Sequence, residues 1–138
     1  MAPESGHTYH ILNAKTGTAL DAADDGPING FELHGGENQR WTLEHNGEHW
    51  TLRNDKGQYL GIGGDIGEGT PLVWTEHPVE WDIWPDRNDD SVYRIYVPGW
   101  HTAMNVDLSD HGNADNGTPI TLWGEWEGQH QAWRFEEV

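Results

Sequence analysis

The sequence predicts an all-β protein, and three features of its composition and pattern support this fold class. Eighteen Gly and seven Pro indicate many turns and argue against long helices. Short stretches of alternating apolar and polar residues, each led by an aromatic residue, are typical of strands. Nine Trp predict an aromatic core in a chain of which only 34% is hydrophobic. With 138 residues, one domain covering 1–138 is expected.

A tryptophan motif divides the chain into three repeats. It reads NQRWTL at 38–43, PVEWDI at 78–83 and HQAWRF at 130–135, so that Trp41, Trp81 and Trp133 are equivalent. Three further strands are expected before each motif: an aromatic-led strand, a second strand after a glycine turn, and a third after a Gly-rich or Asp-rich loop. The repeats so defined cover about residues 7–48, 49–90 and 91–138.

Three pseudo-symmetric four-stranded repeats fit a β-trefoil, in which six strands close a barrel and six form hairpins that cap one end. A three-bladed β-propeller is the competing topology, but propellers need about four blades or more. Closure of the barrel would leave few free strand edges. The residues expected in the core are Trp41, Trp81, Trp133, Leu20, Leu60, Met104, Leu43, Ile83 and Phe135.

The charge and the termini exclude several classes of partner. Seven Lys and Arg stand against 24 Asp and Glu, and a formal charge of −17 repels phosphate backbones and anionic membrane surfaces. Nucleic acid is therefore not an expected partner. The N-terminus has no basic segment followed by an apolar one, and no apolar run approaches the roughly 18 residues of a membrane span. We expect a cytoplasmic protein without a signal peptide and without membrane insertion.

The sequence carries no catalytic or metal-binding motif. The nine His include EHNGEH and GQHQ, but neither has zincin spacing, and the absence of Cys excludes thiolate sites and disulfides. Acidic neighbours such as Asp24 with Asp25 point apart on strands or turns, so no glycosidase dyad is indicated. There is also no nucleophile elbow or phosphate loop. We therefore expect no enzyme, no cofactor and no metal.

A glutamine two residues before the tryptophan recurs in the chain. Gln39 precedes Trp41 and Gln131 precedes Trp133, and both pairs lie in register within the threefold pattern. With an aspartate after the second strand, this pattern resembles the ricin B-type (QxW) β-trefoil lectins. Over the whole chain it is most similar to the small single-domain lectins of mushroom fruiting bodies. A buried side-chain amide can bond loop backbone on both sides, so both glutamines are expected to support loops rather than touch ligand.

The resemblance implies a carbohydrate-binding lectin that recognises terminal galactose or N-acetylgalactosamine, including N-acetyllactosamine. Galactoside-containing glycans and glycoproteins would be its partners, and fungal defence its role. Small fungal members are often homodimers, and the resemblance implies the same here. In the family each repeat can hold a shallow site, which combines an aspartate after the second strand, an aromatic platform at the end of the third strand and an asparagine before the glutamine.

In the first repeat the resemblance assigns sugar contacts to Asp21, His34 and Asn38, with Gln39 behind them. Asp24, in the adjacent turn, is a weaker candidate for a fourth contact. His34 departs from the large aromatic platform that the family usually has. The carboxylate would accept from two neighbouring hydroxyls, and hydrogen bonds to a charged acceptor are worth about 1.5 to 3 kcal/mol each.

The second repeat lacks most of these residues. Gly61, Pro78 and Val79 stand in the places of the aspartate, asparagine and glutamine, and only a platform residue, Trp74, is present. We therefore expect no galactose binding in the second repeat.

The third repeat keeps part of the pattern. The resemblance assigns a weaker site to Asn105 in the aspartate place, Trp123 as platform, His130 in the asparagine place and Gln131 behind them. Asn105 is neutral, and His130 is longer than asparagine, so a weaker site than the first is expected.

Two other functions stay open at this point. A β-trefoil protease inhibitor would act through exposed loops such as GDIGEG at 64–69 or PDRNDD at 85–90, and would not depend on Asp21. A sugar-binding module of a glycosidase is the third reading, against which the length of the chain argues.

Overall fold

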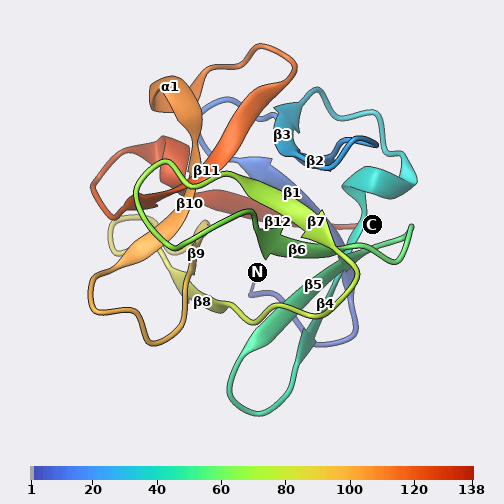
Figure 1. Ribbon diagram of the computed structural model, residues 1–138, viewed down its shortest axis with the longest axis horizontal. Coiled ribbons are helices and arrows are strands. Elements are labelled where there is room, and N and C mark those ends of the chain that lie inside the picture. Colours follow the sequence, from blue (N-terminus) through green and yellow to red (C-terminus); the bar gives the residue numbers. More distant parts are fainter. Residues whose placement is uncertain (1) are drawn as a thin grey trace.

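The computed structural model describes residues 2–138, and this part of the chain contains twelve short strands (Figure 1). The first four are β1 (Thr8–Asn13), β2 (Ala19–Ala22), β3 (Ile28–Phe31) and β4 (Trp41–His45). The next four are β5 (Trp50–Asn54), β6 (Tyr59–Ile62), β7 (Leu72–Thr75) and β8 (Asp82–Pro85). The last four are β9 (Tyr93–Tyr96), β10 (Met104–Leu108), β11 (Thr118–Gly124) and β12 (Trp133–Glu137). Single helical turns occur at η1 (Glu37–Gln39), α1 (Ser109–Gly112) and η2 (Gln129–Gln131).

Six of the strands close a barrel. β1 pairs antiparallel with β4 and β12, β4 with β5, and β9 with β8 and β12. The ring is completed between β5 and β8, where Trp50 and Trp81 exchange two backbone hydrogen bonds of 2.8 Å. The other six strands form three hairpins, β2 with β3, β6 with β7, and β10 with β11. This is the β-trefoil arrangement that the threefold pattern predicts, and the all-β prediction is confirmed.

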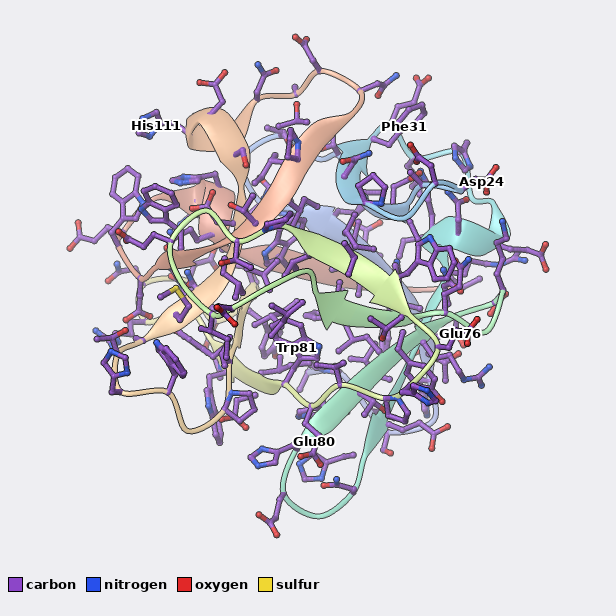
Figure 2. All side chains as sticks on the ribbon, viewed as in Figure 1. Asp24, Phe31, Glu76, Glu80, Trp81 and His111 are labelled. Atoms are coloured by element: carbon purple, nitrogen blue, oxygen red, sulfur yellow. The ribbon has the colours of Figure 1, made fainter. Side chains whose placement is uncertain are left out.

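The three motif tryptophans fix each repeat around the core. The indole Nε1 of Trp41 donates to the Leu20 carbonyl at 2.9 Å, and Trp81 does the same to Leu60 at 3.0 Å. All three indoles are fully buried, and Figure 2 shows Trp81 near the centre of the molecule. Because each indole has a backbone partner, its large apolar surface is buried without leaving a polar group unsatisfied.

All nine residues predicted for the core are buried. One equivalence, however, is corrected. Trp133 Nε1 donates to the Val106 carbonyl at 3.2 Å, so Val106 and not Met104 stands where the other repeats have Leu20 and Leu60. The cause is a longer connection before the second strand, which spans residues 97–103 in the third repeat against 14–18 in the first.

Candidate functional site

The first-repeat site lies beside the hairpin of β2 and β3. Asp21, on β2, is buried, and its Oδ2 accepts a hydrogen bond from Gln39 Nε2 at 2.8 Å. His34 Nε2 lies 3.6 Å from the same oxygen, and Asn38 Nδ2 donates to the Ala22 carbonyl at 3.2 Å. The structure therefore brings together three of the residues that the sequence assigns to sugar binding, with the glutamine behind them.

Gln39 holds this arrangement through a fully buried amide. Besides Asp21, its Nε2 donates to the Glu32 carbonyl at 2.9 Å. Its Oε1 accepts from the backbone N–H groups of His34 at 2.9 Å and Gly35 at 3.2 Å. One side chain thus orients the carboxylate and fixes the loop after β3, because donor and acceptor ends of the amide are both used.

Gln131 repeats most of these bonds in the third repeat. Its Nε2 donates to Asp107 Oδ2 at 2.8 Å and to the Gly124 carbonyl at 3.0 Å. Its Oε1 accepts from the Trp126 N–H at 3.0 Å. Asp107 and Trp126 therefore occupy the places that correspond to the aspartate and platform of the first repeat.

The predicted position Asn105 needs correction, because the longer connection before β10 shifts the register. The predicted platform Trp123 also needs correction, because Trp126 and not Trp123 makes the backbone bond to the glutamine that His34 makes in the first repeat. Asn105 is fully buried, donates to the Trp123 carbonyl at 3.1 Å and accepts from Arg94 at 3.3 Å, so it is a structural residue of the hairpin. A signal for the right platform is present in the sequence: Trp126 precedes its glutamine by the same spacing as His34 does in the first repeat.

His130, in the asparagine place, packs against the aspartate of the third repeat. Its Nε2 lies 3.3 Å from Asp107 Oδ2, and both side chains are buried. Burial lowers the pKa of His130 below its ordinary value and raises the pKa of Asp107, although the two groups attract each other. The Trp126 ring meets the imidazole edge to face at a centroid distance of 5.0 Å. An aspartate, an imidazole and an indole therefore converge there.

An open hollow of about 600 Å³ surrounds these groups, a size typical of small-molecule sites. Trp123 lines it as well, although not in the platform place, and α1 forms part of its rim. Two residues of α1, Asp110 and His111, have left-handed backbone angles, with φ of 57° and 52°. Such angles are strained for residues other than glycine and are common at functional sites. Figure 2 shows His111 at the outer edge of the molecule.

The comparisons with known proteins agree with the fold. The family model for ricin-type β-trefoil lectin-like domains matches residues 1–75 and 37–123. The chain belongs to the ricin B-type β-trefoil lectin family. A ricin B-like lectin of Macrolepiota procera, solved in complex with lactose, is 42% identical, with 100% of both chains covered and a TM-score of 0.95. The Rhizoctonia solani agglutinin is 31% identical, over 99% of this chain and 100% of that one, with a TM-score of 0.86.

The fold is also that of a designed threefold-symmetric protein, ThreeFoil. It is 20% identical, with a TM-score of 0.84 and 95% of this chain and 99% of that chain covered. At that identity the likeness concerns the fold alone. No curated protein sequence matches the chain significantly.

A lysine from another repeat contacts a loop beside each candidate site. Lys56 Nζ lies 2.9 Å from Asp24 Oδ1 and, through the hydrogen bond and charge, lowers the pKa of that carboxyl. Asp24 itself is 90% exposed, so its side chain points into solvent beside the first-repeat site (Figure 2). Lys15 Nζ, from the first repeat, donates to the backbone carbonyl of His111 beside the third-repeat site.

The second repeat has no room for an acidic side chain in the aspartate place. A Cβ at Gly61 would lie 2.6 Å from the Thr75 side chain. Val79 packs against the core in the glutamine place. Trp74 is half-buried, and its Nε1 donates to the Ala23 carbonyl at 2.8 Å, so this indole supports the loop of the first-repeat site.

Over residues 2–138, no group of three or more His, Asp or Glu side chains could hold a metal ion. In the same part of the chain, no helix has the length and apolar character needed to cross a membrane.

Proposed function

We propose that the chain is a lectin that binds galactoside-terminated glycans at two sites, around Asp21 in the first repeat and around Asp107 in the third. The observation that carries the proposal is that the two sites share one arrangement of side chains. In each, a buried glutamine orients an aspartate beside an imidazole. The Macrolepiota procera relative, solved with lactose, supports galactosides as the ligand class. Its name, and that of the Rhizoctonia solani agglutinin, support a binding protein rather than an enzyme.

The chemistry of galactose suits this arrangement of side chains. The sugar has a polar rim of adjacent hydroxyls and one apolar face, and it needs convergent hydrogen-bonding groups beside a flat ring. In each site the glutamine Nε2 donates a hydrogen bond to Oδ2 of the aspartate. The carboxylate keeps further acceptor capacity for sugar hydroxyls, because an ionised carboxylate has about four lone-pair positions.

The two sites differ in their platforms. The first offers the imidazole of His34, which is polar and about half exposed, and the third offers the indole of Trp126. An indole presents a larger apolar surface than an imidazole. We therefore assign stacking on the sugar's apolar face mainly to the third-repeat site, and hydrogen bonding mainly to the first.

Two sites in one chain allow binding to glycans that are displayed densely. Asp24 and His111, which mark the two sites, lie on opposite sides of the upper half of the molecule in Figure 2. Open sites of this kind bind with affinities of about 1 mM, or roughly −4 kcal/mol. Engagement of both would raise the apparent affinity by about a hundredfold or more. Homodimer formation, fungal defence and a cytoplasmic location stay predictions from the sequence.

A glycan array and calorimetric titrations with lactose test the proposal. Asp21→Asn and Asp107→Asn each remove one site, so each single variant binds one lactose, and the double variant binds none. Asp65→Asn, an exposed carboxylate in the second repeat, is the matched control and retains both sites. Unchanged binding by the double variant would overturn the proposal.

A further inference from the structure

Two more hollows border the third-repeat hollow. The first, of about 230 Å³, lies over Asp86, Arg87, Glu125 and Trp126, and we call it the bridging hollow. The second, of about 520 Å³, is lined by two tryptophans and by Arg87 and Glu125, among others, and we call it the tryptophan hollow. Glu125 lines all three hollows, and Trp126 lines both the third-repeat hollow and the bridging hollow. The three hollows therefore adjoin one another in a row.

The loops that form this row are joined by their backbones. The Glu125 N–H donates to the Ala103 carbonyl at 2.8 Å, which connects the loop between β11 and β12 to the loop between β9 and β10. Figure 1 shows α1 and these two loops along one side of the molecule. The extra residues of the β9–β10 connection thus form part of the surface next to the third-repeat site.

The tryptophan hollow combines aromatic faces with hydrogen-bonding groups. Trp84, on β8, is 60% exposed, and Trp100, in the β9–β10 loop, is 36% exposed. Tyr96, Thr102 and Asp82 also line the hollow. Exposed indoles among hydroxyl and carboxylate groups offer the two contacts that a sugar ring makes, stacking and hydrogen bonding.

The charges along the row favour neutral sugars. Arg87 Nη2 lies 3.1 Å from Glu125 Oε1, and the buried Arg94 lies 2.7 Å from Asp86 Oδ1, so each guanidinium is already paired. Glu127, Asp82 and the third-repeat carboxylates add further negative charge. An anionic glycan would therefore meet repulsion from an acidic surface.

We propose that the third-repeat site extends past Trp126 and Glu125 into the tryptophan hollow, and that it recognises neutral oligosaccharides longer than a disaccharide. The inference rests on the proposed function, because it places the terminal galactose beside Asp107. The following sugar units cross the bridging hollow, and the next ring contacts Trp84 and Trp100.

The test uses calorimetry on the Asp21→Asn variant, in which only the third-repeat site is expected to bind. Lactose is compared with a neutral linear tetrasaccharide that ends in galactose. The tetrasaccharide binds about tenfold more tightly than lactose, the gain expected from a few added contacts. Adding Trp84→Ala and Trp100→Ala removes this gain and leaves lactose binding unchanged. A sulfate on the second sugar unit of the tetrasaccharide weakens its binding.

Controls separate the possible failures. Leu33→Ala, which truncates another exposed apolar side chain, retains the tenfold gain, and Trp100→Phe retains part of it. Equal binding of lactose and tetrasaccharide would overturn the extension and leave the galactoside site standing. If neither lactose nor the tetrasaccharide binds, both the proposed third-repeat site and its extension are wrong. Sedimentation velocity adds one outcome: if the tryptophan substitutions convert a dimer to monomers, the hollow is a protein interface and the proposal is wrong.

Discussion

The aspartate of each site depends on neighbouring side chains for its position. In the third repeat Asp107 accepts from Gln131 and lies beside His130, in a place where burial raises the pKa of its carboxyl. The same burial lowers the pKa of the imidazole, so His130 is neutral at pH 7. An ionised carboxylate is the stronger acceptor for sugar hydroxyls. Protonation of Asp107 would therefore remove the ionised acceptor on which the proposed third-repeat site depends.

The affinity of the third-repeat site for lactose should decrease as the pH is lowered. The decrease should begin at a higher pH than for an ordinary aspartate, which titrates near about pH 3.9. The reason is that a raised pKa brings protonation of Asp107, and loss of the acceptor, at a higher pH. Calorimetric titrations of Asp21→Asn from pH 7 to 4 measure this. An affinity that stays constant down to about pH 4 would contradict the prediction.

At the scale of the elements, the connections between strands decide where the site residues lie. The strands and the core tryptophans could be predicted, because alternation and a repeated motif determine them locally. The residues that the structure groups around Asp21 were assigned from the family resemblance. Asp107 could not be placed by counting from the start of its repeat, because the longer β9–β10 connection shifts the positions on β10. Trp126 could have been placed by counting five residues back from Gln131. The half-burial of Trp74 against the Ala23 carbonyl depends on a contact between two repeats.

The turn of α1 should be sensitive to substitution at Gly112. Its φ is +84°, and an added Cβ would lie 2.7 Å from His130 Cβ and from Lys15 Cδ. We expect Gly112→Ala to reduce the free energy of unfolding by about 1 to 3 kcal/mol and to weaken lactose binding at the third-repeat site only.

The matched control for this prediction is Gly117→Ala. Gly117 has a similar φ of +91°, but an added Cβ there meets no atom within 4 Å. Gly117→Ala should therefore reduce the free energy of unfolding through backbone strain without changing lactose binding. Equal losses of lactose binding in the two variants would show that the packing of α1 on His130 is not what matters.

At the scale of the whole molecule, Arg94 connects the second repeat to the third. Its guanidinium is buried, pairs with Asp86 at 2.7 Å, and donates to Gln131 Oε1 at 3.0 Å and to the Trp126 carbonyl at 2.8 Å. The glutamine that orients the third-repeat aspartate is therefore itself held by an ion pair that begins near β8. One network of side chains therefore joins the end of β8 to the third-repeat site.

Removing this guanidinium should destabilise the fold strongly. Arg94→Met leaves Asp86 buried without its partner, which typically costs about 3 to 5 kcal/mol. Urea unfolding at pH 7 measures this loss of stability. Arg87→Met, which truncates an exposed arginine, is the control and should change the free energy of unfolding little. A loss of less than about 1 kcal/mol for Arg94→Met would contradict the assigned role.

The same pair predicts a dependence of stability on pH. Burial raises the pKa of Asp86, but the bonds from Arg94 and from the amides of Asn88 and Asp89 outweigh it, and the pKa lies below its ordinary value. A lowered folded pKa means that this contribution is fully present above about pH 4 and is lost as the pH falls through the lowered pKa. Arg94→Met should show a weaker acid dependence than the native chain in urea unfolding between pH 5 and 2.

The most direct test of a lectin with two galactoside sites is a crystal structure of the native chain soaked with lactose. The account predicts a galactose ring hydrogen-bonded to Asp21 in the first repeat, a second ring hydrogen-bonded to Asp107 beside Trp126, and none at Gly61 in the second repeat. Lactose bound elsewhere, with both aspartates free of sugar, would contradict it.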